Sequence, residues 1–144
     1  MALGRRKLLL VGGGVVCAHA IGCGGSEPIV LPAEIPAGNK AGVPLNTLVP
    51  VSGAAAAIAR DSGGIYALSL VCTHQGCDIA ANGGPVTFNV IHCGCHGSEF
   101  DHLGNVRLGP ANRPLDHLAV TADAAGALTI HGQQVVPATD RLAV

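Results

Sequence analysis

The sequence predicts an all-β protein with one folded domain, for which 144 residues suffice. It contains 21 glycines and nine prolines spread along the chain, a composition that favours short strands and turns over long helices. Phe88, Phe100 and Tyr66 are the only aromatic residues. Because a core poor in large rings buries less apolar area per side chain, we expect it to depend on a metal cluster or a disulfide.

The first predicted strands lie between residues 46 and 68. Residues 46–51 form the first strand. Residues 53–60 are rich in alanine, which favours helices, but we predict a strand because Asp61-Ser62-Gly63-Gly64 is a hairpin signal. Residues 65–68 then form the second strand of this hairpin.

A second hairpin is predicted over residues 78–91, with strands at 78–81 and 86–91 and a turn at Asn82-Gly83-Gly84-Pro85. This hairpin would separate two segments that are rich in cysteine and histidine. Its strand pairing would therefore bring those two segments together.

The remaining strands are short. We expect them near Phe100 and over residues 105–107, 118–121 and 128–130, with a turn at Ala124-Ala125-Gly126 between the last two.

Residues 1–22 are typical of an export signal. Arg5, Arg6 and Lys7 precede an apolar stretch that is shorter than the ~20 residues of a membrane span. Paired arginines before a leucine run resemble a twin-arginine signal, which exports folded proteins. An ordinary secretory signal and an uncleaved anchor are the alternatives.

A cleavage site for a lipoprotein is predicted at Ala20-Ile21-Gly22-Cys23, where small residues precede a cysteine that would be acylated. The alternative is that Cys23 is a free cysteine. Residues 23–42 are rich in Gly, Pro, Ala and Ser, and we expect them to form a flexible tether to a domain over residues 43–144.

Net charge is −1 for the whole chain, and removal of residues 1–22 leaves five basic and nine acidic residues. The chain has no basic stripe and no aromatic platform, which argues against nucleic-acid binding. A mildly acidic surface favours a basic partner such as a small cationic cytochrome.

Two short segments, residues 72–77 and 93–98, carry the chemistry of the chain. Two cysteines and two histidines at such spacings suit a two-iron cluster with sulfur ligands on one iron and nitrogen ligands on the other. A single tetrahedral zinc ion and a pair of disulfides without metal are the alternatives. The segments read Cys72-Thr73-His74-Gln75-Gly76-Cys77 and Cys93-Gly94-Cys95-His96-Gly97-Ser98.

These segments resemble the two cluster-binding loops of Rieske iron–sulfur proteins. They match the subgroup with an extra cysteine in each loop, found in cytochrome bc complexes and related periplasmic oxidoreductases. Residues 109–114, Gly-Pro-Ala-Asn-Arg-Pro, resemble the proline-rich loop over the cluster, and the resemblance covers residues 46–130. It implies three stacked antiparallel sheets and a cluster-binding subdomain inserted at about residues 71–114.

The resemblance implies one [2Fe-2S] cluster per chain. Cys72 and Cys93 would hold the inner iron, and His74 and His96 the outer iron. Because imidazole replaces two thiolates, such clusters have potentials of about −150 to +300 mV, against about −400 mV for plant-type ferredoxins.

Cys77 and Cys95 match the disulfide that joins the two loops in this subgroup. Such a bridge contributes roughly 2–4 kcal/mol and requires an oxidising compartment, which agrees with an export signal. If the leader is cut before Cys23, five cysteines remain. One would be acylated, two would bind iron and two would pair.

Outside the four ligands, the resemblance assigns Ser98 a hydrogen bond to a bridging sulfide. We expect Asp101 to accept hydrogen bonds in a turn. His102, His117 and His131 lie in or beside predicted turns, and we expect them to be solvated.

The function implied is one-electron transfer in an exported protein on the periplasmic side of a bacterial membrane. A cytochrome c or the large subunit of an oxidoreductase would be its partner. The alternative is a subunit of a larger complex, either quinol–cytochrome c reductase-like, with quinol as the reductant, or periplasmic and molybdenum-dependent, like arsenite oxidase. Rieske ferredoxins of ring-hydroxylating oxygenases lack the extra cysteine pair. No separate catalytic set or phosphate loop is evident.

Phe100 departs from the pattern of the family that this sequence resembles. Many respiratory Rieske proteins have tyrosine at this position, with its hydroxyl bonded to a ligand sulfur. Phenylalanine donates no such bond, which leaves more electron density on sulfur and lowers the potential. We expect Phe100→Tyr to raise the reduction potential, measured by redox titration. An unchanged or lower potential would contradict this reasoning.

Overall fold

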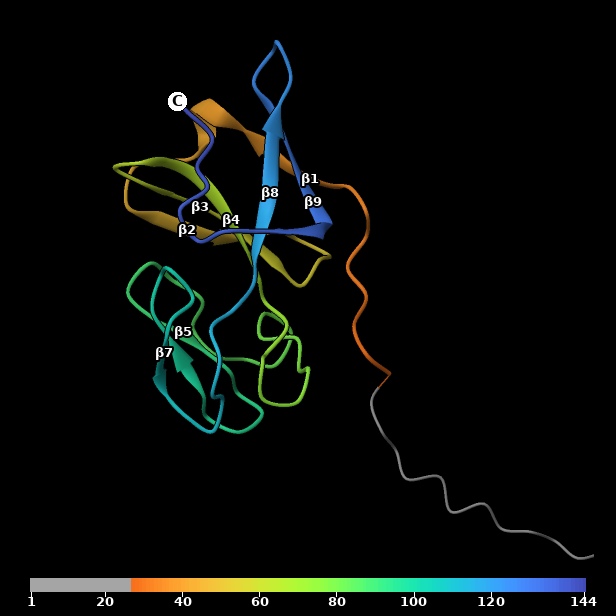
Figure 1. Ribbon diagram of the computed structural model, residues 1–144, viewed down its shortest axis with the longest axis vertical. Coiled ribbons are helices and arrows are strands. Elements are labelled where there is room, and N and C mark those ends of the chain that lie inside the picture. Colours follow the sequence, from red (N-terminus) through yellow and green to blue (C-terminus); the bar gives the residue numbers. More distant parts are fainter. Residues whose placement is uncertain (1–26) are drawn as a thin grey trace, which may run out of the picture.

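The computed structural model describes residues 27–144 and confirms an all-β protein (Figure 1). The predicted export signal and Cys23 lie outside the described residues. Within them, no helix has the length and apolar character to cross a membrane. The larger sheet contains β1 (Ile35–Asn39), β2 (Thr47–Pro50), β3 (Ala56–Asp61), β4 (Gly64–Ser69), β8 (His117–Ala122) and β9 (Ala127–Val136). The smaller sheet contains β5 (Ile91–His92), β6 (Glu99–Phe100) and β7 (Val106–Leu108).

The predicted hairpin around residues 61–64 is confirmed. β3 pairs with β4 in an antiparallel register that ends at Asp61 and Gly64, so Ser62 and Gly63 form the turn. Gly64 has a φ of 134°, and a Cβ there would overlap the carbonyl oxygen of Leu142, so glycine is required at this position.

β3 and β4 are buried on both faces, which explains their continuous apolar sequence. Side chains on one face belong to the core of the larger sheet, and side chains on the other face belong to a core shared with the inserted unit. The first set includes Ala56, Ile58, Ile65 and Ala67; the second includes Ala57, Ala59, Tyr66 and Leu68. Because successive side chains of β3 and β4 point to opposite faces, these two strands join the larger sheet to the inserted unit.

The inserted unit occupies the chain between β4 and β8, as the resemblance implied (Figure 1). β4 and β8 are neighbours in the larger sheet, with Ala67 opposite Leu118. The chain therefore leaves the sheet after Ser69, builds the smaller sheet and its loops, and returns beside its point of exit.

The hairpin predicted over residues 78–91 is wrong. Asp78 begins a turn, because its side chain accepts a hydrogen bond from Ala81 N at 3.1 Å and its carbonyl accepts one from Asn82 N at 3.1 Å. Only a single bridge joins Val86 to Ile91. The strand that follows, β5, instead pairs with β6 across the second cysteine–histidine segment.

The flexible tether predicted over residues 23–42 is wrong for its C-terminal part. Ile35–Asn39 forms edge strand β1, which pairs with β9, and Lys40–Gly42 forms a 3₁₀ turn. Ile35 and Ala37 are buried against the core of the larger sheet, and Pro36 is tolerated because β1 lies at an edge.

The resemblance implied three stacked sheets, whereas residues 27–144 form two. Hydrogen bonding between β4 and β8 keeps the six strands continuous. Ile35 of β1, Ile58 of β3 and Ile130 of β9 nevertheless share one core, so the larger sheet curls around its own apolar face.

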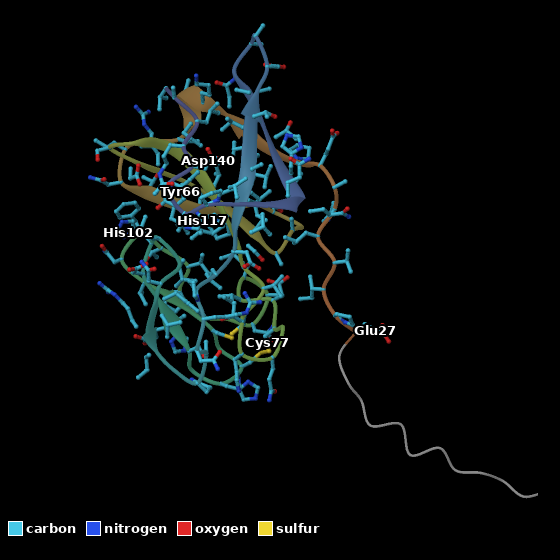
Figure 2. All side chains as sticks on the ribbon, viewed as in Figure 1. Glu27, Tyr66, Cys77, His102, His117 and Asp140 are labelled. Carbon is cyan, nitrogen blue, oxygen red and sulfur yellow. A yellow bond between two sulfur atoms is a disulfide. The ribbon has the colours of Figure 1, made fainter. Side chains whose placement is uncertain are left out.

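Tyr66 connects the larger sheet to the inserted unit, at the junction in Figure 2. Its hydroxyl donates to the carbonyl oxygen of His102 at 2.8 Å. The guanidinium of Arg141 lies 4.1 Å from its ring centroid, and Arg141 also pairs with Asp61 at 2.9 Å. Burial opposes ionisation of Asp61, but hydrogen bonds from Arg141 and from the backbone N–H groups of Gly63 and Gly64, with the charge of Arg141, together outweigh it and lower the pKa of this carboxyl.

The prediction that His117 is solvated is wrong, because its side chain is buried. Its ring stacks on Tyr66, with centroids 5.7 Å apart, and its Nε2 lies 2.8 Å from the carbonyl oxygen of Leu103. A carbonyl only accepts, so Nε2 carries the proton, and Nδ1 is buried without a partner. Burial lowers the pKa of His117, and the charge of Arg141 adds to this effect.

We expect Arg141→Ala to lower the free energy of unfolding by roughly 2–3 kcal/mol, because it removes a partly buried ion pair and a cation–π contact. Urea titration measures the loss. Arg107→Ala removes an exposed arginine and is the matched control, with an expected change within about 0.5 kcal/mol. Equal losses in the two variants would contradict this role of Arg141.

His117 should make the protein less stable in acid. Since its folded pKa lies below its unfolded value of 6.5, the unfolded chain binds the proton first, and stability falls as pH drops below about 6.5. The hydrogen bond to the carbonyl of Leu103 and the charges of Asp101 and Asp116 raise this pKa, but they only partly offset the effects of burial and of Arg141.

We expect His117→Gln to flatten the decline of the urea midpoint between about pH 7.5 and 5.5. Glutamine retains a donor for the carbonyl of Leu103. His131→Gln, on β9, is the control and should decline like the wild type. A wild-type slope in His117→Gln would refute the assignment.

Candidate metal centre

Two loops with the same backbone turn form the centre: the first Cys–His loop, residues 72–77, and the second Cys–His loop, residues 93–98. In the first, Cys72 N donates to the carbonyl of residue 77 and the N–H of residue 76 returns to Cys72 O, both at 2.8 Å. In the second, Cys93 N donates to the carbonyl of residue 98 at 2.8 Å, and the N–H of residue 97 returns to Cys93 O at 2.9 Å. Each loop is thus closed by its own first cysteine.

Gly76 and Gly97 occupy the same position in these turns, with φ of 75° and 80°. A Cβ at either glycine would meet no atom within 4 Å. The left-handed backbone, and not crowding, therefore requires glycine in each loop.

Cys72 and Cys93 are the free cysteines among residues 27–144, and both are buried. Burial raises the pKa of the Cys93 thiol, and the neighbouring Cys72 thiol raises it further. Backbone N–H groups of Cys95 and His96 act in the opposite direction. A bound cation would supply the positive charge that these two sulfurs need to become thiolates.

His74 and His96 lie together on the outer side of the two loops. Their ring centroids are 4.8 Å apart and their planes are nearly perpendicular, at 87°. His96 is exposed and His74 is half-buried. Nδ1 of His74 is buried without a hydrogen-bond partner, which leaves this nitrogen available as a metal ligand.

This arrangement fits a [2Fe-2S] cluster with mixed ligands, because it presents two buried thiols and two outer imidazoles. A group of three sulfur atoms is also present, in which Sγ of Cys77, Cys93 and Cys95 lie within 4.8 Å of one another. Cys77 and Cys95 form a disulfide, so this group does not offer three thiolates to zinc.

The Cys77–Cys95 disulfide joins the two Cys–His loops, as the resemblance implied. It links residues 18 positions apart, with a Cα–Cα distance of 6.7 Å. In Figure 2 it lies within the inserted unit, away from the junction residues Tyr66 and His117.

The proline loop, residues 109–114, is fixed to both Cys–His loops. Thr73 Oγ1 donates to the carbonyl oxygen of Arg113 at 2.7 Å, and Ala111 N donates to Ser98 Oγ at 2.9 Å. Thr73 was not predicted from the sequence; its one signal is a hydroxyl between Cys72 and His74.

Ser98 is fully buried, and since its oxygen already accepts from Ala111, its hydroxyl proton remains for another acceptor. Phe100 is also fully buried, on β6 opposite Ile91 and Val106. The tuning roles of Ser98 and Phe100 stay predictions.

Asp101 holds the loop after β6, as predicted. Its carboxylate accepts from Leu103 N and Asn105 N, both at 2.9 Å. The ring of His102 in this loop stacks on Phe88, with centroids 4.2 Å apart.

Comparison with known proteins identifies the fold and the centre together. The family model for the Rieske [2Fe-2S] domain matches residues 29–122. The cytochrome b6-f complex iron-sulfur subunit of Synechococcus sp. (strain JA-3-3Ab) is 41% identical over 68 residues, which cover 46% of this chain and 38% of that protein. The cytochrome bc1 complex Rieske iron-sulfur subunit of Corynebacterium diphtheriae is 40% identical over 77 residues, which cover 52% and 18%.

A solved structure with a similar fold is a complex of reduced oxygenase and oxidized ferredoxin in carbazole 1,9a-dioxygenase. One of its chains aligns with a TM-score of 0.50 and 24% identity, over 73% of this chain and 98% of that chain. At this identity the likeness concerns the fold alone. The chain spans less than two fifths of the length of the two curated relatives above.

We expect Thr73→Val to loosen the proline loop by about 1 kcal/mol, the usual net contribution of one hydrogen bond. If that loop covers the cluster, iron should be lost to a chelator roughly fivefold faster, followed by the decay of visible absorbance. Thr87→Val is the matched control, because Thr87 is exposed and bonds only to nearby Val90. Equal decay rates would contradict this role.

Proposed function

The chain belongs to the Rieske [2Fe-2S] family, and from this membership we propose that it carries single electrons. We propose that the cluster is held by Cys72 and Cys93 on one iron and by His74 and His96 on the other. The observation that carries the proposal is that a disulfide-linked pair of loops presents two buried thiols, one from each loop, and two adjacent imidazoles, one with an orphaned Nδ1.

A bound cluster with two imidazole ligands supplies a one-electron couple at higher potential than an all-thiolate cluster. The chain's own residues would set how electrons reach it. Exposed His96 and half-buried His74 give the side on which a partner approaches, while Cys72 and Cys93 are buried away from water. Backbone N–H groups near Cys93 and the free hydroxyl proton of Ser98 favour added negative charge.

The test of ligation is EPR of the dithionite-reduced protein. We expect a rhombic signal whose average g value lies below that of all-thiolate clusters, because nitrogen ligates one iron. Cys72→Ser and His74→Gln should abolish the signal, whereas His131→Gln should retain it. An unchanged signal in either ligand variant would disprove the ligand set.

We also propose that the protein is exported and held by a lipid on Cys23 at the periplasmic side of the membrane. The twin arginines, the short apolar leader and the Cys77–Cys95 disulfide support this proposal. An Arg5→Lys, Arg6→Lys double variant should remain in the cytoplasm with its cluster formed, and Cys23→Ser should move from the membrane to the soluble fraction. Cell fractionation with immunoblotting measures both outcomes.

A second candidate is a permanent subunit of a larger oxidoreductase. The names of the bc1 and b6-f relatives favour a complex of the quinol–cytochrome c reductase type. The alternative is a periplasmic molybdenum enzyme whose large subunit holds the substrate site. Purification from mild detergent distinguishes these cases: co-purifying cytochrome b indicates the first, a molybdenum subunit indicates the second, and the chain alone supports a carrier for a cytochrome c.

A further inference from the structure

A free thiol lies beside the disulfide. Sγ of Cys93 is within 4.8 Å of both sulfur atoms of Cys77–Cys95, and Cys93 is unpaired. Cys72 is also free but does not belong to this group of three sulfurs. Thiol–disulfide exchange needs an attacking thiol within reach of a disulfide, and among residues 27–144 Cys93 is the free cysteine placed close to both sulfurs of one.

We propose that Cys93 exchanges with the Cys77–Cys95 disulfide whenever iron does not hold its sulfur. This inference rests on the proposed role of Cys93 as an iron ligand. The Cys93 sulfur loses its proton and forms a bond to Cys77 or Cys95, the Cys77–Cys95 bond breaks, and the released sulfur takes up a proton. The protein has one disulfide and one thiol in this group before and after the exchange, so no oxidant or reductant is required.

The exchanged forms are unable to hold the cluster. In each of them Cys93 is part of a disulfide and offers no thiolate, while the released thiol belongs to a residue outside the ligand set. Iron at Cys93 and the Cys77–Cys95 bond therefore protect each other. The inference predicts an order of assembly, with the cluster inserted before the disulfide forms, and export of a folded protein would produce that order.

Disulfide mapping tests the inference without using electron transfer. The holoprotein is divided, and one half is stripped of iron with a chelator in an anaerobic chamber. Both halves are sampled over hours, quenched in acid, alkylated in denaturant and digested for mass spectrometry, with Cys17 and Cys23 followed in the same maps.

In the stripped protein, we expect disulfides that contain Cys93 to rise at least about tenfold above the holoprotein, with matching alkylation of Cys77 or Cys95. The Cys72→Ser variant, which lacks a ligand and is expected to hold no cluster, should also exchange in the same incubation, and Cys93→Ser should not. Retention of the Cys77–Cys95 pairing in the stripped wild type would overturn the inference. So would disulfides of Cys72 as abundant as those of Cys93, because an unfolded chain exchanges without regard to position.

The same experiment separates this inference from the proposed function. The EPR signal of the starting holoprotein reports on the cluster, and the maps report on exchange. A normal signal followed by no exchange sinks only the inference, whereas a missing signal in a protein that retains iron sinks the ligand assignment.

Discussion

The metal centre depends on bringing together two loops, residues 72–77 and 93–98, that have the same backbone turn. Each turn is closed by hydrogen bonds to and from its own first cysteine and needs a glycine in left-handed backbone near its end. Neither turn alone presents more than a thiol and an imidazole. The disulfide joins the turns directly, and the proline loop joins them again through Thr73 and Ser98. The disulfide and the proline loop thus connect the two turns and hold the four candidate ligands close together.

The hairpin of β3 and β4 connects the inserted unit to the rest of the domain, because alternate residues of these strands pack into two different cores. All three aromatic side chains belong to the core on the metal side: Tyr66 and Phe100 lie inside it, and Phe88 packs against it. The limited aromatic surface of the chain is therefore concentrated where the inserted unit meets the sheet. Arg141 extends that junction by covering the Tyr66 ring and pairing with Asp61, so the C-terminal segment also supports the inserted unit.

The position of Cys93 allows its sulfur two reactions: it can bind a metal ion, or it can exchange with the neighbouring disulfide. Burial favours the neutral thiol of Cys93, so a cation is needed to hold it as a thiolate. The same position places it next to a disulfide. A metal site and a disulfide at such short range have to be completed in the right order, which connects the geometry of the centre to the route by which the protein is made.

The sequence by itself determined the local features: the turn at residues 61–64, the glycines of the two Cys–His loops, and a set of donor residues suited to mixed sulfur and nitrogen ligation. These follow from residue type and short spacing, which act within a few residues. The tertiary structure alone decided that Ile35–Asn39 is a strand, because its partner β9 lies some ninety residues further along the chain. It also decided that His117 is buried against Tyr66 and that Cys93 approaches the disulfide. Each of these depends on a contact between segments that are distant in the sequence. The free energy of such a contact depends on both segments together and cannot be predicted from the local sequence of either one.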